Sequence, residues 1–251
     1  QSGRYGTFQA AVFYMVDRLC IANPNHSPRF FASPDFAEKN TPASFLTVHM
    51  ADALMKIINL VPVQVRALGY AHKLPALEPI AVRGYDLVDT EVLFHTGAVA
   101  HIITGWAIPD TAWANTVQSG RLICSDGLID LALDMPGLRE IHADGIFEVN
   151  PLFKNFEKDG RVTGYGISGP GRLYRQILDL RNQRMSEADQ RESRSPLVLG
   201  FHTALVLEAA EKSLAARQRL DSGATLGTTI DLRQLVVAEL GAAAARDYGY
   251  T

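Results

Sequence analysis

The chain has 251 residues, 47% of them hydrophobic, and a formal net charge of −3 at neutral pH. This length and apolar content are sufficient for one large domain with a full core, so we expect residues 1–251 to form a single domain. The basic residues are scattered and outnumbered by acidic ones, which argues against a nucleic-acid-binding surface. No apolar run approaches the roughly 18–20 residues of a membrane span, so we expect a soluble, cytoplasmic protein that binds neither nucleic acid nor a membrane.

The first part of the chain is predicted to form a strand and then a loop. Residues 6–16 alternate between apolar and polar side chains, as a strand with one buried face does. Residues 21–40 show no such period and are rich in turn-forming residues. We therefore expect a long loop before the first helix.

That helix carries an unusual polar stripe. Thr41 is a good N-cap and is followed by a proline at the first helical position, which predicts a helix start there. At helical spacing, Phe45, His49, Asp52 and Lys56 share one face, and the other faces are apolar. The pattern alone permits His49 to be a structural histidine satisfied by Asp52, or a functional one.

Strands dominate the middle of the chain. Turns as short as Thr96-Gly97 make consecutive strands antiparallel, while amphipathic segments at both ends of the run can cover one face. The fold class is therefore α+β, with a large, open, mostly antiparallel sheet and helices on one face. The predicted strands lie near residues 61–72, 82–95, 98–107, 113–124, 128–134 and 139–143.

A glycine-rich loop precedes the next predicted helix. Residues 164–169 match the dinucleotide-binding pattern G-x-G-x-x-G, and residues 172–184 can form a helix after it. Both flanking segments are too polar to be central parallel strands, so we expect an ordinary loop. The charged residues 186–196 then connect to a last long helix over residues 201–220.

The cysteines and histidines show no metal-binding spacing. Cys20 and Cys124 are isolated in apolar surroundings, and the seven histidines are dispersed along the chain. We therefore expect two buried free thiols and no metal site.

The segment around His49 resembles the C-terminal domain of the Gfo/Idh/MocA oxidoreductases. In that family, a helix with the pattern His-x-x-Asp precedes a strand reading Pro-x-x-Val-x-Ala. Here the helix has His49 and Asp52, and the strand has Pro62, Val65 and Ala67. The implied fold is a dihydrodipicolinate-reductase-like or glyceraldehyde-3-phosphate-dehydrogenase-like C-terminal domain.

The likeness extends in order over most of the chain. Residues 85–109 resemble the paired strands that end in a Gly-Trp step, here Gly105-Trp106. Residues 123–131 resemble a glycine-rich strand entry, with Cys124 where a glycine is usual, and residues 201–220 resemble the last long helix.

Two departures separate this chain from the family pattern. Relatives that oxidise a sugar or polyol have an aspartate one turn before the histidine, and this chain has Phe45 there. Relatives also have an N-terminal Rossmann domain with a phosphate-binding turn and a Glu-Lys-Pro segment, which nothing in this chain supplies. We therefore expect no cofactor-binding residues in this chain, and no activity from this chain alone.

The resemblance implies hydride transfer between NAD or NADP and a secondary hydroxyl of a sugar or polyol. His49 is then the base or a direct ligand of the hydroxyl, because a neutral imidazole can accept the hydroxyl proton, and Asp52 orients its ring. The implied substrate contacts are Asp52, Asn23, His26, Arg29 and Tyr165.

Two other functions on the same fold stay open. The loss of the acid at Phe45 favours a ligand-sensing regulator that does not turn its ligand over. The second is an oligomerisation module. Residues 98–107 place apolar groups on both faces of their strand, and helices can cover only one face. We therefore expect a homodimer or homotetramer assembled through the open face of the sheet, as the resemblance also implies.

Overall fold

The computed structural model describes residues 5–112, 114–132, 138–142, 145–149, 155–156, 162–163, 169–186, 197–220 and 223–250. Its contacts divide the chain into two compact units. The larger unit joins residues 1–133 to residues 197–251, and the smaller one is formed by residues 134–196.

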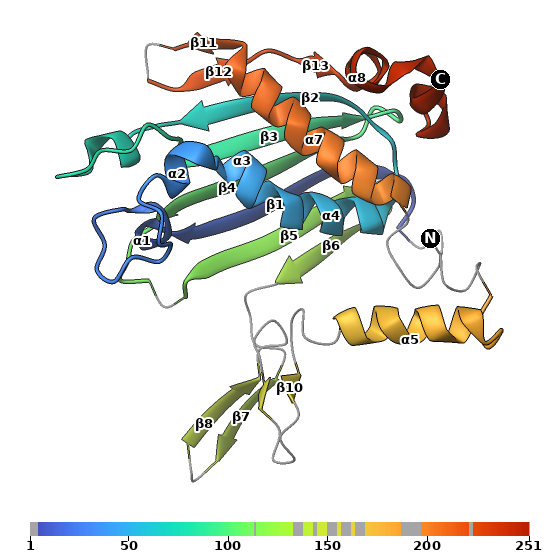
Figure 1. The fold of residues 1–251 in the computed structure, drawn as a ribbon, viewed down its shortest axis with the longest axis horizontal. Helices are drawn as coiled ribbons and strands as arrows, with labels where there is room; N and C mark the ends of the chain where they lie inside the picture. Colours follow the sequence, from blue (N-terminus) through green and yellow to red (C-terminus); the bar gives the residue numbers. More distant parts are fainter. Residues whose placement is uncertain are drawn as a thin grey trace. The chain divides into compact units, whose positions relative to one another are not determined.

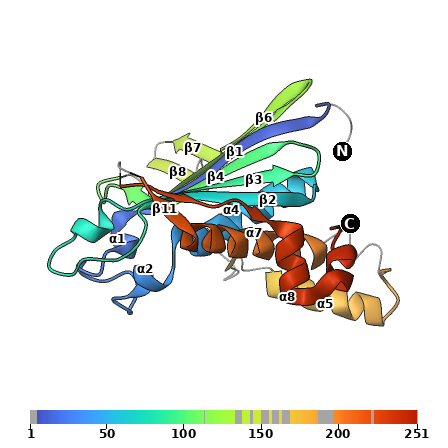
Figure 2. The same ribbon diagram turned by 90° about the horizontal axis from the view of Figure 1, so that it is seen from above.

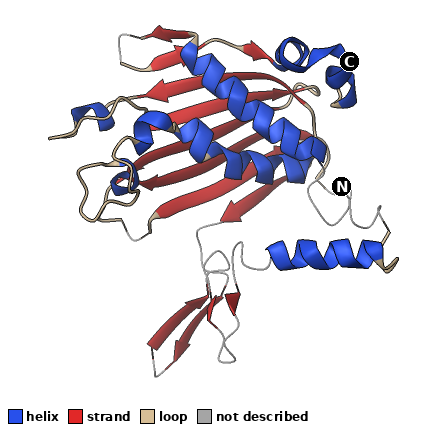
Figure 3. Ribbon diagram, in the orientation of Figure 1, coloured by secondary structure: helices blue, strands red, loops and turns tan. Residues whose placement is uncertain are grey.

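The larger unit is built on a nine-stranded sheet (Figures 1 and 3). The strand order is β11-β12-β2-β3-β4-β1-β5-β6, and β13 pairs with another part of β2. All of these pairs are antiparallel except β1 with β4, which confirms the predicted α+β fold with a mostly antiparallel sheet. The strands are β1 (Phe8–Arg18), β2 (Pro62–Tyr70), β3 (Leu87–Phe94), β4 (Val99–Ile108), β5 (Thr116–Cys124), β6 (Gly127–Ala132), β11 (Arg217–Arg219), β12 (Thr225–Gly227) and β13 (Ile230–Asp231).

The position of β1 in the sheet is not the one that a simple run of β-hairpins would give. The β3–β4 hairpin forms at the predicted turn, where Gly97 has a φ of 85°. The next strand along the chain does not continue the meander, because β1 lies between β4 and β5. A predicted strand order that places only sequence neighbours side by side therefore misses the parallel pairing of β1 with β4 at the centre of the sheet.

The helices of this unit lie on one face of the sheet. Figures 1 and 2 show α4 and α7 crossing the same face, and α8 lies on that side near the C-terminus. The predicted one-sided cover is therefore correct. The helices are α1 (Leu19–Ala22), α2 (Phe36–Lys39), α3 (Pro42–Phe45), α4 (Thr47–Ile58), α7 (Leu197–Ala215) and α8 (Leu232–Asp247), with a 3₁₀ turn η1 (Leu74–Ala76).

The covered face forms the core. In β4, the side chains of Ala100, Ile102, Thr104 and Trp106 are buried, whereas those of Val99, His101 and Ile103 are only partly buried. This alternation was predicted for the strand. Beneath it the core continues through large apolar side chains that are almost fully buried, among them Phe13, Leu54, Met55, Phe94, Leu122 and Val206.

The Gly105-Trp106 step has a structural reason. A Cβ atom at Gly105 would lie 2.5 Å from the carbonyl oxygen of Asp86, so β3 and β4 can approach this closely only at glycine. The next residue, Trp106, is fully buried, and its indole N–H donates to the carbonyl of Tyr85 at 3.0 Å. The step therefore locks the end of β4 against the segment that leads into β3.

The opposite face of the sheet is part apolar and part charged. One row of paired residues crosses it from Arg66 through Glu91, His101, Val12 and Arg121 to Asp130. Within this row Arg66 pairs with Glu91 at 3.1 Å, and Arg121 pairs with Asp130 at 2.5 Å. Beside the charges, Val12 is 42% exposed, and Ile123 and Leu128 are exposed to a similar degree.

The smaller unit contains short strands and one helix. Strand β7 (Leu138–His142) pairs with β8 (Gly145–Val149), and β9 (Asn155–Phe156) pairs with β10 (Val162–Thr163), both antiparallel. Helix α5 (Gly169–Arg181) confirms the helix predicted over residues 172–184. The glycine-rich loop and most of the charged connector lie outside the described residues. The described strand before the loop, β10, is two residues long and antiparallel, which is not the parallel strand a dinucleotide site requires.

Several elements at the C-terminal end were not predicted. The last predicted helix, over residues 201–220, ends at Ala215 in the structure and is followed by β11, β12 and β13. Helix α8 was missed because its apolar residues follow no clear helical period and it changes direction at Gly241, where φ is 87°. Among the described helices, none is long and apolar enough to cross a membrane.

Candidate functional site

The helix that carries His49 begins where the sequence predicts. The Thr41 hydroxyl accepts a hydrogen bond from the Ser44 N–H at 3.2 Å, and the Ser44 hydroxyl accepts one from the Thr41 N–H at 3.1 Å. This reciprocal capping box, with Pro42 at the first helical position, fixes the start of α3.

The predicted single helix is two helices, because it is interrupted at Leu46. At this junction the Thr104 hydroxyl donates to the carbonyl of Pro42 at 3.1 Å and lies 2.9 Å from the Thr47 hydroxyl. Both bonds are buried and tie the junction to β4. The Pro42 carbonyl also keeps its helical bond from the Leu46 N–H at 3.0 Å, so the Thr104 hydroxyl adds a tertiary bond at the end of α3, which a helical period in the sequence does not reveal.

His49 lies on the outer face of α4. Met50, Ala51, Leu54 and Met55 are buried against the sheet and α7, whereas His49 is exposed. The surrounding protein atoms lower the pKa of His49 by desolvation, and the nearby Asp52 carboxylate opposes this by raising it. The net effect is a pKa below the usual value. The imidazole is therefore neutral at pH 7 and able to accept a proton.

Phe45, at the place of the family's acid, is a packing residue. Its ring centroid lies 5.0 Å from that of Phe36 and 5.8 Å from those of Phe31 and Trp106. These rings belong to a small second core beside α1 and α2. The aromatic cluster therefore occupies the space one turn before His49.

The three predicted loop contacts bond within their own loop. The Asn23 side-chain oxygen accepts from the Asn25 N–H at 2.9 Å, and the Arg29 Nε donates to the Pro24 carbonyl at 2.9 Å. His26 Nδ1 lies 2.8 Å from the Pro28 carbonyl oxygen. Among the hydrogen bonds of the described residues, none joins these side chains to His49. Tyr165, the contact predicted from the glycine-rich loop, lies outside the described residues.

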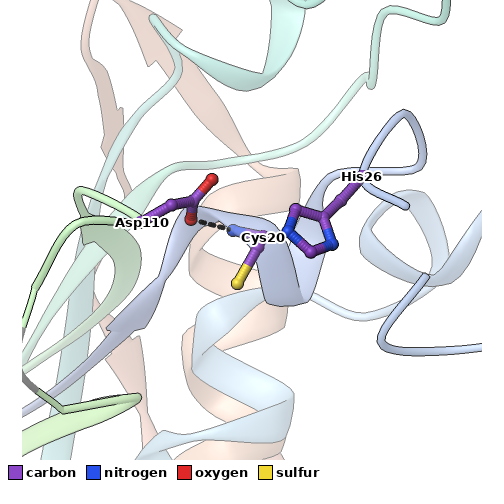
Figure 4. A group of neighbouring side chains, drawn as sticks. All are labelled: Cys20, His26 and Asp110. Atoms are coloured by element: carbon purple, nitrogen blue, oxygen red, sulfur yellow. Dashed lines mark hydrogen bonds between the residues drawn. The ribbon is translucent and has the colours of Figure 1, made fainter. Parts of the chain in front are cut away.

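A group of side chains that the sequence did not reveal lies at the end of the parallel strand pair. Because β1 and β4 run parallel, Arg18 pairs with Ile108, and the segments that follow both strands start side by side. Cys20 and Asp110 therefore meet although they are 90 positions apart, and the loop after α1 brings His26 to them (Figure 4). The half-buried thiol of Cys20 is thus not isolated, in contrast to the sequence-based expectation.

The sequence matches no family model and no curated protein. Solved structures do match the fold. The scyllo-inositol dehydrogenase of Lactobacillus casei, with bound NAD(H) and scyllo-inositol, is 11% identical with a TM-score of 0.52, and the match covers 89% of this chain and 58% of that one. Its apo form is 10% identical with a TM-score of 0.53, over 90% and 57% of the two chains.

An oxidoreductase from Agrobacterium radiobacter, in complex with NAD⁺, L-tartaric acid and magnesium, is 15% identical with a TM-score of 0.50. That match covers 93% of this chain and 59% of the other. The chain thus spans less than three-fifths of the length of these structures. At these identities the likeness concerns the fold, which is that of one domain of NAD-binding dehydrogenases and oxidoreductases.

Proposed function

We propose that this chain is the substrate-binding domain of a Gfo/Idh/MocA-type oxidoreductase that acts on a secondary hydroxyl of a sugar or polyol. The observation that carries the proposal is a neutral histidine on the outer face of α4, in a fold similar to that of a scyllo-inositol dehydrogenase. The fold alone hosts many functions, so His49 and its surroundings have to carry the chemistry.

In this proposal His49 is the general base. The substrate carbon loses hydride to NAD or NADP, which supplies the hydride acceptor when bound. The hydroxyl proton passes to the imidazole, so that the hydroxyl becomes a carbonyl and His49 becomes an imidazolium. The Asp52 carboxylate, one turn along α4, stabilises that positive charge and orients the ring.

We further propose Asn23, Arg29 and Tyr165 as substrate contacts, but not His26, whose ring lies beside Cys20 and Asp110. Arg29 is exposed and uses one guanidinium N–H on the Pro24 carbonyl, which leaves further donors for hydroxyl groups. The cofactor is expected to be bound mainly by a part of the protein outside this chain.

The test is His49→Ala in the complete protein, with its nucleotide-binding domain present. Loss of a positioned base lowers turnover by about 10²–10⁴-fold, with little change in stability at this exposed position. His72→Ala is the matched control, because His72 is also exposed but lies outside α4. A folded His49→Ala enzyme that keeps its rate on every accepted sugar would show that His49 is not the base.

The pH profile gives a second readout. The base must be neutral, so oxidation should fall as the pH drops through the pKa of His49, which lies below the usual 6.5. His72→Ala should leave the profile unchanged. An acid limb that persists in the residual activity of His49→Ala would assign the titration to another group.

A ligand-sensing function without turnover is the second candidate. The packing of Phe45 in the aromatic cluster favours it, because no carboxylate is present one turn before His49. One experiment on the complete protein distinguishes a ligand-sensing regulator from a dehydrogenase. A regulator binds its sugar by calorimetry but leaves the nicotinamide absorbance unchanged.

A further inference from the structure

The cluster at the ends of β1 and β4 contains three different metal-binding side chains. One potential ligand atom from each of Cys20, His26 and Asp110 lies within 4.8 Å of the other two. Cys20 belongs to α1, His26 to the loop that follows it, and Asp110 to the turn after β4. Three segments of the backbone therefore converge on one point.

Two of the three ligands, Asp110 and His26, are each held in place by a hydrogen bond to a backbone group. The Asp110 Oδ1 accepts from the Cys20 N–H at 2.8 Å, which leaves Oδ2 available. His26 Nδ1 lies 2.8 Å from the Pro28 carbonyl, so Nδ1 carries the proton and Nε2 keeps its lone pair. Figure 4 shows one ring nitrogen turned toward Cys20 and the other turned away. Outer hydrogen bonds that fix a histidine tautomer and a carboxylate in this way are typical of metal sites.

The arrangement does not suit a cysteine nucleophile. A nucleophilic triad needs the carboxylate to orient the histidine, whereas Asp110 bonds to the backbone of Cys20. Burial and the Asp110 carboxylate both raise the pKa of the Cys20 thiol, although nearby Arg18 lowers it. A dication between the Cys20 thiol and the Asp110 carboxylate would favour the anionic form of both groups.

The three ligand atoms favour one class of metal ion. A thiolate and a carboxylate balance a dication, and the imidazole completes a set of one sulfur, one nitrogen and one oxygen. Calcium and magnesium prefer all-oxygen sites, whereas zinc takes this mixture. Zinc ligands lie about 2.0–2.3 Å from the ion, which puts the ligand atoms of a tetrahedron about 3.3–3.8 Å apart. The three ligand atoms lie within 4.8 Å of one another, so a contraction of at most about 1.0–1.5 Å reaches that geometry.

We propose that Cys20, His26 and Asp110 bind a Zn²⁺ ion, with the fourth position open to water or an exogenous ligand. Three protein ligands and an open position are the pattern of exchangeable and catalytic zinc sites. The proposal stands apart from the proposed dehydrogenase function, because it uses neither His49 nor the cofactor.

The test is a titration of the reduced, metal-free 251-residue chain with Co²⁺ under anaerobic conditions. We expect one Co²⁺ per chain, with the near-ultraviolet charge-transfer absorption that reports a thiolate ligand, and its loss when Zn²⁺ is added. Zn²⁺ should also raise the thermal midpoint of the chain, because an ion that binds only the folded state stabilises it.

Three variants and one control assign the ligands. Cys20→Ser should abolish the charge-transfer band. Asp110→Asn keeps an oxygen for the Cys20 N–H, and His26→Gln keeps an N–H for the Pro28 carbonyl, so both should fold. Each should weaken Zn²⁺ binding by at least about 10–100-fold, the loss seen when even outer partners are removed. Cys124→Ser, which removes the other free thiol, should leave the band and the affinity unchanged.

Two results would overturn the site. One is the absence of any thiolate band at millimolar Co²⁺ in a chain that circular dichroism shows to be folded. The other is a band that survives Cys20→Ser and disappears in Cys124→Ser, which would place the metal at the other cysteine.

Discussion

The Ser213 hydroxyl on α7 accepts a hydrogen bond from the Ala67 N–H of β2 at 3.0 Å. It also donates to the Thr228 carbonyl at 2.6 Å. Ala67 lies between the part of β2 that pairs with β12 and the part that pairs with β13. Ser213 therefore satisfies a backbone N–H of β2 at the gap between the two short strands that pair with it.

This bridge predicts the effect of Ser213→Ala. The substitution leaves the buried Ala67 N–H and the Thr228 carbonyl without the hydroxyl, so we expect a loss of about 1–3 kcal/mol of unfolding free energy. Denaturant unfolding measures it. Ser119→Ala, on the open face of the sheet, is the matched control and should change stability by less than about 0.5 kcal/mol. Equal effects at both positions would show that the bridge contributes nothing specific.

A buried histidine predicts how stability depends on pH. His202 on α7 is 2% exposed, and its Nε2 lies 2.9 Å from the Tyr248 carbonyl. Burial lowers the pKa of His202 below the usual 6.5, although the bond to Tyr248 opposes this. The unfolded chain therefore binds a proton at a higher pH than the folded chain does. Stability is full above about pH 6.5 and falls as the pH drops toward the folded pKa, with a slope of up to about 1.4 kcal/mol per pH unit.

The check is a series of unfolding curves between about pH 5 and pH 8, the range over which a histidine changes charge. His202→Gln should reduce the slope but not remove it, because the pKa of His49 is lowered as well. His72→Gln, at an exposed position, should keep the wild-type slope. An unchanged slope in His202→Gln would assign the acid sensitivity to other groups.

The aromatic cluster predicts that Phe45→Asp does not restore an acid in a working position. The substitution removes three ring contacts and places a carboxylate among Phe31, Phe36 and Trp106. We expect the unfolding free energy to fall by about 2–4 kcal/mol. The loss should not be larger, because Phe45 is only half-buried. Phe45→Leu stays apolar and should cost less than about 1.5 kcal/mol. If Phe45→Asp unfolds at the same denaturant concentration as the wild type, the ring does not support the cluster.

The open face of the sheet predicts assembly. We expect a homodimer, or a dimer of dimers, formed through the face that carries Val12 and Ile123, since these apolar side chains are exposed beside ion-paired ones. Val12→Glu should give monomers, because it introduces a charge at the centre of the interface. The new carboxylate lies between His101 and Arg121 in the sheet, so the variant should still fold.

Light scattering at micromolar concentration measures the assembly state. Leu240→Glu on α8 is the matched control, because it changes an equally apolar and more exposed residue on the helix side. It should leave the oligomer intact. A monodisperse wild-type monomer, or a dimer unaffected by Val12→Glu, would contradict assembly through this face.

Local patterns predicted local structure well. The alternation in residues 98–107, the turn at Gly97 and the cap at Thr41 each depend on neighbouring residues, and the structure confirms them. The break at Leu46 lies where Thr104, a residue of strand β4, bonds to the end of α3. The sequence could not reveal it, because a helical period carries no information about a distant hydroxyl.

The same distinction applies to the candidate sites. The stripe that exposes His49 follows from the helical period of one segment. The cluster of Cys20, His26 and Asp110 requires the parallel pairing of β1 with β4, which no spacing rule for cysteine and histidine includes. A site built from the ends of two parallel strands could have been found only after the strand order was known.

The central place of β1 also constrains how the chain folds. The first strand along the sequence, β1, cannot complete its backbone pairing until both of its neighbours, β4 and β5, have been made. Of these two, β5 comes later in the sequence and ends at Cys124. Until then both edges of β1 lack their backbone partners, and its apolar face is uncovered. Pairings of such long sequence separation are slow to form, and exposed strand edges invite association between chains. During synthesis, β1 can therefore pair with β4 only after residues up to Ile108 have been made, and with β5 only after residues up to Cys124.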